Sequence, residues 1–364
     1  MKSSELIIAG YVCGDYFYDG DVDDFKSRFG NESFIPNGVS YGDSKVSIRE
    51  GSTSDFFNFL YQRANGKIKS IQSGGGGENS RKAFMRERVE SCYIDTSTQP
   101  QFNTGFNYSN GSYFAGISPH AVSLIIPSQN NGNGAGTFTL KAGRGDVGKY
   151  LGRAVVKNVE SLLRNGDDVL VNSISNSHLA DVIASNVRGD LYSVITTYLG
   201  KTGEELNRLM RSSRVNFFSA KEFYWINDKD KKFNDLFKGD FSLDKAVKIH
   251  QDMKEFADER KLVGSLVVTI GENGAIHYNR NNGRYSKWVR LKIDERENIQ
   301  EHLKKNNQST NSAGDNFTAR FIHALREEEA TIEEAIIEGS EFAIKEVLNY
   351  NLKGGNNFLV DKLK

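Results

Sequence analysis

The sequence predicts an α/β protein in which helices cover both faces of a mostly parallel central sheet, a three-layer α/β/α sandwich. Segments with strand and helix patterns alternate over most of the 364 residues. The strand-like segments are short and almost wholly apolar, as in "LIIAGYV" and "SLVVTIG". Strands of this composition are typical of parallel sheets buried on both faces. Such sheets bind ligands beyond the carboxyl ends of their strands.

The predicted elements follow one another in a regular order. Apolar periodicity predicts strands over 6–12, 168–173, 191–199, 214–219 and 265–271, and helices over 80–89, 149–166, 176–187, 202–212, 242–261 and 331–350. Thr202 is followed three residues later by Glu205, a pattern that predicts Thr202 as the N-cap of its helix. We expect a single domain over residues 1–364.

Two regions interrupt the alternation. Residues 20–70 are polar and rich in Gly, Asp and Ser, with a clear helical pattern only over 55–64. Residues 103–140 contain short strand patterns joined by Asn-Gly turns. We expect a small β lid, contributed by about 14–50 and 93–127. A lid sheet with one uncovered face needs a partner or a ligand, which makes a homodimer through the lid a further prediction.

The composition argues against several classes of function. The chain has 47 basic and 47 acidic side chains and no net charge, so nothing favours nucleic-acid binding. No apolar run approaches the roughly 18 residues of a membrane span, and the N-terminal segment makes a poor signal peptide. Cys13 and Cys92 have no metal-binding spacing and favour a reduced, cytoplasmic setting, and the six histidines are scattered singly.

The glycine-rich segment "AGRGDVGKY" (142–150) contains a G-x-G-x-x-G pattern before a predicted helix. A P-loop needs a hydroxyl-bearing Ser or Thr after the lysine, where Tyr150 stands. A dinucleotide site needs an acid at the end of the next strand, but "DVLVNS" ends in Asn172 and Ser173. We therefore favour a glycine turn that caps a helix. A dinucleotide enzyme, with its cofactor at residues 143–148, is the alternative.

Two other glycine-rich segments are stronger candidates for a site. "SGGGGENSRKAF" (73–84) lets the backbone approach a ligand closely, and the Asn79 amide can donate to and accept from sugar hydroxyls. A flexible linker is the alternative.

In "NSAGDNFTARF" (311–321), a helix begins at Ala313, Gly314 and Asp315, whose N–H groups and helix dipole make an anion site. Asp315 can accept a proton from a hydroxyl while these amides stabilise a transferred phosphoryl group. The alternative is that Asp315 only stabilises the helix N-terminus.

The order of these motifs resembles that of the ribokinase-like (PfkB-type) carbohydrate kinases over most of the chain. The matching motifs are Gly14-Asp15 with Asp19, the GGxGxN run that ends at Asn79, the T-x-G-x-x-G turn from Thr269 to Gly274, and the segment from Ser309 to Asp315 in place of D-T-x-G-A-G-D. The resemblance implies a ribokinase-like sandwich. It also implies a kinase that uses ATP and Mg²⁺ to phosphorylate a hydroxyl of a sugar, polyol or nucleoside.

The resemblance also implies a role for each matching residue. Asp315 corresponds to the catalytic base, and the turn at Ser312 with the amides of Ala313, Gly314 and Asp315 corresponds to the anion hole. The implied substrate-binding residues are Asp19, Gly75, Gly76 and Asn79, and the implied nucleotide-binding residues are Thr269, Gly271 and Gly274. Glu222 matches the acid of an N-x-x-E element and would act on the magnesium through water.

The sequence departs from the family pattern at three serines. Ser219 replaces the Asn of N-x-x-E, Ser309 replaces the leading Asp of the last motif, and Ser312 replaces its first Gly. The segment 294–308 is longer and more charged than the family usually shows, and the insert 20–70 is also unusual for it. Two alternatives to a sugar kinase therefore stay open: a nucleoside kinase of the same fold, and a non-catalytic sensor that binds a sugar or nucleotide.

Overall fold

The computed structural model describes residues 6–10, 13–29, 65–89, 91–95, 122–131, 134–142, 163, 166–174, 177–196, 203–279, 286–306, 310, 312–353 and 355–363. The helix predicted over 55–64, the glycine turn at 143–148 and nearly all of the helix predicted over 149–166 lie outside these residues.

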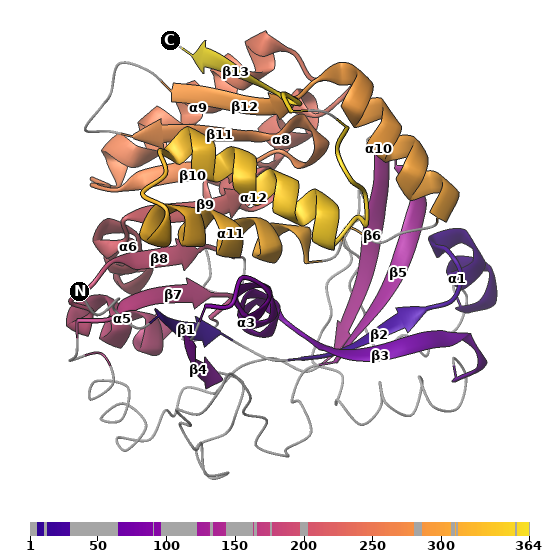
Figure 1. Ribbon diagram of the computed structural model, residues 1–364, viewed down its shortest axis with the longest axis horizontal. Helices are drawn as coiled ribbons and strands as arrows, with labels where there is room; N and C mark the ends of the chain where they lie inside the picture. Colours follow the sequence, from indigo (N-terminus) through magenta and orange to yellow (C-terminus); the bar gives the residue numbers. More distant parts are fainter. Residues whose placement is uncertain are drawn as a thin grey trace.

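A nine-stranded sheet forms the centre of the molecule, with the strand order β13-β12-β11-β10-β9-β8-β7-β1-β4 (Figure 1). The strands are β1 (Leu6–Gly10), β4 (Ser91–Asp95), β7 (Asp168–Asn172), β8 (Leu191–Val194), β9 (Val215–Ser219), β10 (Ser265–Thr269), β11 (Ala275–Asn279), β12 (Ser286–Leu291) and β13 (Phe358–Leu363). Neighbouring strands are parallel from β10 to β4, and β11 to β13 extend the sheet in antiparallel pairs. The predicted mostly parallel sheet is confirmed.

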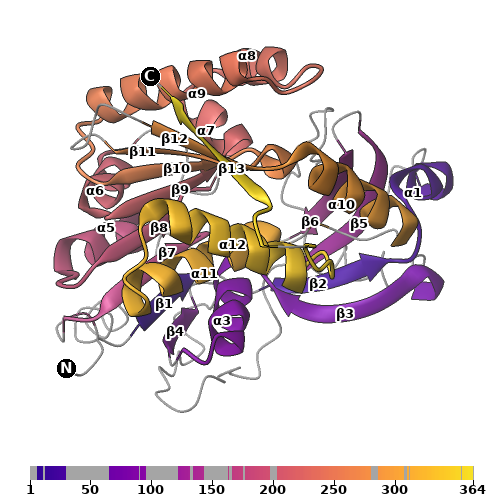
Figure 2. The same cartoon turned by 45° about the horizontal axis from the view of Figure 1, so that its top comes forward.

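Helices cover both faces of this sheet because successive side chains of its strands point to opposite sides. On β1, Ile7 and Ala9 pack into the core beneath α5 (Ser177–Asn186), α6 (Glu204–Ser212), α7 (Ala220–Ile226), α8 (Asp230–Leu236) and α9 (Leu243–Glu259). Leu6 and Ile8 pack into a second core with α3 (Gly76–Arg86), α10 (Ile293–Asn306), α11 (Ala313–Glu327) and α12 (Ile332–Glu346). The predicted three-layer α/β/α sandwich is confirmed (Figure 2).

A second, four-stranded sheet has the order β3-β2-β5-β6 and lies beside the carboxyl ends of the parallel strands (Figure 1). Its strands are β2 (Cys13–Tyr18), β3 (Ile68–Gly74), β5 (Val122–Asn131) and β6 (Gly134–Ala142); α1 (Val22–Phe29) follows β2, and the short helix η1 (Asn65–Lys67) precedes β3. The chain first enters this sheet just after β1 and leaves it just before α3, and it returns after β4 to form β5 and β6. The two sheets therefore join where β1 ends and α3 begins.

The extent of the lid stays a prediction. Most of the ranges 14–50 and 93–127 lies outside the described residues. Within them fall most of β2, all of α1 and the first residues of β5, whereas β3 and β6 of the second sheet lie beyond them.

Two helix starts differ from the sequence prediction. Gly203, in extended backbone, is the N-cap of α6, so the prediction of Thr202 was wrong. No side chain caps this helix. Glu204 and Glu205 in its first turn stabilise it through the positive end of the helix dipole. The helix predicted from residue 80 begins earlier, within the glycine run, with Gly75 as its N-cap. None of the described helices has both the length and the apolar composition of a membrane span.

Candidate active site

Asp315 lies in the first turn of α11, where this helix meets α3 and the carboxyl end of β7. The Asn79 amide of α3 donates from Nδ2 to Asp315 Oδ2 at 3.0 Å. The amide of Asn172, the last residue of β7, donates from Nδ2 to Asp315 Oδ1 at 2.8 Å. The structure thus brings together Asp315 and Asn79, two of the predicted site residues, and fixes both oxygens of the carboxylate.

Asn172 is a site residue that the sequence analysis missed. Its side chain is fully buried, and Nδ2 also donates to Gly76 O at 3.0 Å and to Ser80 Oγ at 2.8 Å. Ser173 Oγ donates to Asn172 Oδ1 at 2.8 Å. One amide therefore ties β7 to both α3 and α11. The available signal was its position, because polar residues at the carboxyl ends of parallel strands are candidates for a site.

The glycines of the site are needed for two different reasons. Gly75 has a φ of 93°, and a Cβ on Gly76 would lie 2.2 Å from Ser173 Oγ. Gly75 is required by its backbone conformation, and Gly76 is required for α3 to approach the end of β7 closely. Among the described residues, a Cβ on Gly314 would meet no atom within 4 Å, and the backbone of Gly314 has no positive φ. Within the described part of the chain, no close contact requires this glycine and no atom fills the space beside its Cα.

Ser312 stands where the carbohydrate-kinase motif has glycine, and it adopts the left-handed conformation that glycine favours. It is the N-cap of α11 with φ 70° and ψ 0°, which costs a non-glycine residue roughly 1 kcal/mol. Its carbonyl oxygen accepts from the Asn316 backbone N–H at 3.0 Å and from Asn316 Nδ2 at 2.9 Å. The Ala313 N–H donates to Thr310 O at 3.2 Å, so this predicted anion-hole donor already has a partner. Ser309 lies outside the described residues.

The predicted nucleotide turn follows β10 and forms the short helix η4 (Gly271–Asn273). Thr269 ends the strand and donates from Oγ1 to Phe218 O at 3.3 Å. Gly271 and Gly274 have φ values of 59° and 90°, and a Cβ on Gly274 would lie 2.0 Å from Val289 O. Both glycines are therefore explained by the shape of the turn.

The charged segment 294–308 folds largely as α10 and braces this turn. Arg296 Nη1 donates to Asn273 Oδ1 at 2.9 Å, and Gln300 donates to Glu272. From β12, Trp288 Nε1 donates to Asn273 O at 2.7 Å. Since α10 also packs against β6, it connects the turn to the second sheet.

Glu222 lies beyond the carboxyl end of β9. Ser219, which is paired with Thr269 in the sheet, donates to Glu222 Oε2 from its backbone N at 3.2 Å and from Oγ at 2.7 Å. The Ser219 hydroxyl accepts in turn from the Glu222 N–H, which completes a capping box for α7. The serine that replaces the family's Asn therefore acts as a helix cap.

The residues present suit a magnesium ion held mainly by phosphate and water. In the described part of the chain, no group of three or more His, Cys, Asp or Glu side chains is placed to hold a metal. Mg²⁺ commonly binds through one or two carboxylates together with substrate phosphates and keeps several waters. Glu222, partly exposed at the carboxyl edge of the sheet, fits that outer role.

Asp19 is not brought to the other predicted residues. At the start of β2, Cys13 pairs with Gly74, beside the glycine run. Asp19 follows the other end of the strand, about 20 Å away at the rise of a β-strand, and its side chain is exposed. Asp15 of the same motif lies much nearer the site along β2.

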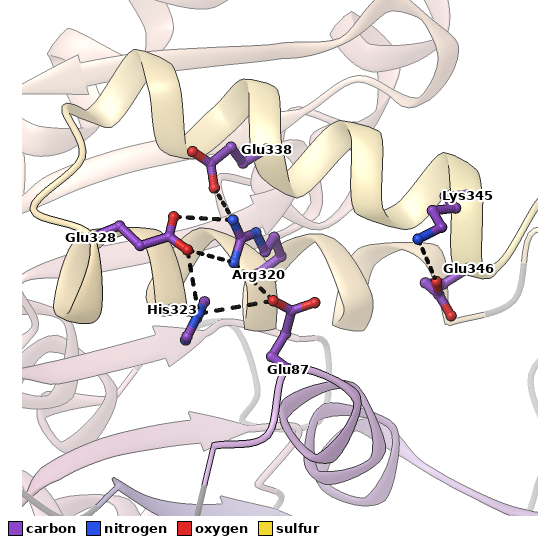
Figure 3. A network of polar contacts seen from close by, with 7 residues as sticks. All are labelled: Glu87, Arg320, His323, Glu328, Glu338, Lys345 and Glu346. Carbon is purple, nitrogen blue, oxygen red and sulfur yellow. Dashed lines mark hydrogen bonds and ion pairs between the residues drawn. The ribbon is translucent and has the colours of Figure 1, made fainter. Parts of the chain in front are cut away.

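A polar network connects the C-terminal end of α3 with α11 and α12 (Figure 3). Arg320 of α11 donates to Glu87 at 2.8 Å and to Glu328 at 3.0 Å and also pairs with Glu338. Burial and a hydrogen bond to Glu328 raise the pKa of Glu338. Burial opposes ionisation of Glu328, but hydrogen bonds from Glu338 and Arg320 lower its pKa. The helices that carry Asn79 and Asp315 are thus held together at a second point.

The order of the sheet, the two layers of helices and the second sheet beside the strand ends define the class of structure: the chain has the ribokinase-like fold. Adenosine kinase from Sinorhizobium meliloti is similar to it with a TM-score of 0.59 and 14% identity, covering 95% of this chain and 94% of that chain. Ribokinase from Arabidopsis thaliana, complexed with ribose and ATP, is similar with a TM-score of 0.54 and 13% identity, covering 97% of this chain and 94% of that chain.

A nucleoside kinase from Methanocaldococcus jannaschii is similar with a TM-score of 0.50 and 15% identity, covering 95% of this chain and 92% of that chain. No protein-family model matches the sequence, and no curated protein matches it. At these identities the likeness shows the fold alone.

Proposed function

We propose that the protein is an ATP-dependent kinase that transfers the γ-phosphoryl group to a hydroxyl of a sugar or related polyol. The observation that carries this proposal is Asp315, a carboxylate held by two amides at a helix N-terminus, beside the open space at Gly314. A carboxylate oxygen accepts more than one hydrogen bond, so Asn79 and Asn172 leave capacity for a substrate hydroxyl. The fold is shared with sugar and nucleoside kinases.

The proposed reaction is an in-line displacement at the γ-phosphorus. The acceptor hydroxyl oxygen forms a bond to phosphorus, the bond to the β,γ-bridging oxygen breaks, and ADP leaves. Asp315 accepts the hydroxyl proton as general base. The N-terminus of α11 favours the charge on the transferred group through its dipole and its first-turn N–H groups.

The nucleotide is proposed to bind along Thr269, Gly271 and Gly274. In this arrangement, the turn beyond β10 and the N-terminus of α11 approach the phosphates from two sides. Bound Mg²⁺ would neutralise phosphate charge, with Glu222 holding it through water. On the acceptor side, we assign hydroxyl binding to Asn79 with Gly75 and Gly76. Asp19, the acidic residue that the sequence predicts for the acceptor, follows the far end of β2, so its contact would require β2 to bend towards the site.

Turnover by the purified protein tests the proposal. We expect ADP formation from Mg-ATP that depends on an acceptor from a panel of sugars, polyols and nucleosides. Asp315→Ala is expected to reduce turnover by about 10²- to 10⁴-fold, the usual contribution of a general base. Asp244→Ala is the matched control, because Asp244 also lies in the first turn of a helix, α9, and is exposed.

The outcome also separates the alternatives. Turnover with nucleosides but not with sugars or polyols favours the nucleoside kinase. Binding of ATP or a sugar by the folded protein, with no turnover across the panel, contradicts the kinase proposal and favours a sensor. Binding of NAD by the protein would support the dinucleotide alternative at residues 143–148.

A further inference from the structure

Asn316 is an unusual residue for its place in α11. It follows Asp315 directly and is buried, with 3% of its surface exposed. Asn is a poor helix former, and burying an amide costs free energy unless both of its ends are hydrogen-bonded. A small apolar residue would satisfy the helix at lower cost. The presence of an amide therefore calls for a role that only its hydrogen bonds supply.

Those bonds connect two points of the site. Asn316 Nδ2 donates to Ser312 O at 2.9 Å, and Arg86 Nη1 of α3 donates to Asn316 Oδ1 at 3.0 Å. Arg86 fixes the orientation of the Asn316 amide. Its Nη1 can donate only to Oδ1, so Nδ2 must face Ser312. The side chain of Arg86 is about half exposed, at 46%.

The peptide that Asn316 holds is the one that begins the anion-binding turn. Ser312 lies in the left-handed region, which glycine adopts freely and serine does not. The peptide unit from the Ser312 carbonyl to the Ala313 N–H is planar, so holding its oxygen also sets the direction of the N–H. The Ser312 oxygen also accepts from the Asn316 backbone N–H at 3.0 Å, so Nδ2 supplies the second hydrogen bond to it, and the Ala313 N–H is held by Thr310 O at 3.2 Å. The plane is fixed at both ends, immediately before Gly314 and Asp315.

We propose that Asn316, oriented by Arg86, is a positioning residue that holds the left-handed turn at Ser312 and so aligns the N-terminus of α11 for the transferred phosphoryl group. The proposal rests on the proposed kinase function. Glycine would adopt the left-handed conformation at position 312 without strain. Serine does so at a cost, and we propose that the hydrogen bond from the Asn316 amide offsets this cost. Asn316 itself touches neither substrate nor nucleotide in this mechanism.

The test compares Asn316→Ala with the double variant Asn316→Ala/Ser312→Gly. We expect Asn316→Ala to lower kcat by about 10- to 100-fold, the scale of a small misplacement of a catalytic group, with less change in the KM for the acceptor. Adding Ser312→Gly is expected to restore most of the lost kcat, because glycine holds the turn unaided. Asn316→Asp is expected not to restore kcat, because it places an oxygen against Ser312 O.

Thr318→Ala is the matched control for a merely structural effect, since Thr318 is also a buried polar residue of α11, with 3% of its surface exposed. A kcat loss no larger in Asn316→Ala than in Thr318→Ala would overturn the proposal. So would a failure of Ser312→Gly to restore kcat when it restores the melting temperature. If Asn316→Ala does not fold, Arg86→Ala, a change at a half-exposed residue, must lower kcat in the same direction.

Backbone hydrogen exchange separates this proposal from the kinase proposal. Asn316→Ala is expected to speed exchange at the amides of residues 313 and 316, and Ser312→Gly is expected to reverse that change. Unchanged exchange at both amides overturns the positioning role. Absence of turnover in the wild-type protein overturns the kinase proposal instead, and the exchange measurement still decides whether Asn316 holds the turn.

Discussion

At the scale of single residues, substitution of Gly314 is expected to affect the stability of the fold and the proposed reaction in opposite directions. A Cβ at this position meets no atom of the described residues within 4 Å, and alanine is a better helix former than glycine by about 1 kcal/mol. We expect Gly314→Ala to raise the free energy of unfolding by up to about 1 kcal/mol and to lower turnover at least tenfold, because the methyl group enters the space proposed for the phosphoryl group. Urea unfolding and ADP formation measure the two effects.

Gly339 in α12 is the control for this substitution. A Cβ there would lie 2.7 Å from Phe317 O and 2.9 Å from the Phe317 ring, so Gly339→Ala should lower stability. Gly314→Ala with full turnover would contradict the placement of the phosphoryl group beside this residue.

The buried side chain of His277 is expected to make the free energy of unfolding depend on pH. Burial lowers the pKa of His277 to about 4, with a smaller contribution from Lys287, and Glu333 opposes the shift. Because the folded-state pKa lies below the unfolded value of 6.5, the unfolded chain binds more protons between these pH values. The contribution of His277 is therefore complete above pH 6.5 and is lost as pH falls towards 4. Between about pH 7 and 5.5 the loss is about 1 kcal/mol.

Urea unfolding at both pH values measures this loss in the wild type and in His277→Gln, which keeps a group that can bond Ser265. We expect the variant to lose about 1 kcal/mol less than the wild type on acidification. His178→Gln is the control, because His178 is exposed on α5. Equal losses in all three proteins would show that His277 is not held neutral in the fold.

At the scale of secondary-structure elements, the end of β7 contacts the proposed catalytic residue, whereas the middle of β9 does not. Asn172 and Asn216 are both fully buried strand asparagines with hydrogen-bonded side chains. Asn172 bonds α3 and Asp315, whereas Asn216 bonds Ser193 Oγ and Met210 O. Each change to Ala is expected to cost about 1–3 kcal/mol of stability, because buried groups lose their partners. Only Asn172→Ala is expected also to lower kcat per folded molecule.

The measurement pairs urea unfolding with turnover normalised to the folded fraction. Equal kcat values for Asn172→Ala and Asn216→Ala would mean that Asn172 serves the fold alone, and that Asn79 suffices to orient Asp315.

The same strand end shows what could be read from sequence and what could not. Apolar runs predicted β1, β7 and β10 because burial on two faces leaves a direct mark on composition. The contact between Asn172 and Asp315 joins residues 143 positions apart and leaves no local periodicity. The start of α3 was missed for a related reason: glycines at 76 and 77 are poor helix formers, and close packing against β7 overrides that preference.

At the scale of the whole molecule, the arrangement of the two sheets explains why the site lies where it does. The parallel strands end towards the second sheet, and α3 begins where β3 ends. Asn79 and Asp315 therefore meet at the junction of the sheets. Motif order alone could predict this meeting but not the position of Asp19, because the length of β2 carries that residue away from the junction.

The edge of the second sheet carries the last prediction, a homodimer. Within the described residues, β3 pairs only with β2, and β6 has α10 beside it, so β3 presents the open edge. A seven-residue strand edge that no described strand covers favours pairing with another strand, and a two-fold axis lets β3 pair with its own copy. We expect light scattering after size exclusion to give twice the mass of one chain. Ser70→Lys with Gln72→Lys adds two positive charges to the same strand of each copy, so the repulsion between copies should yield monomer. A wild-type protein that is monomeric throughout a dilution series contradicts the dimer and leaves the lid edge to be covered by substrate or by other parts of the chain.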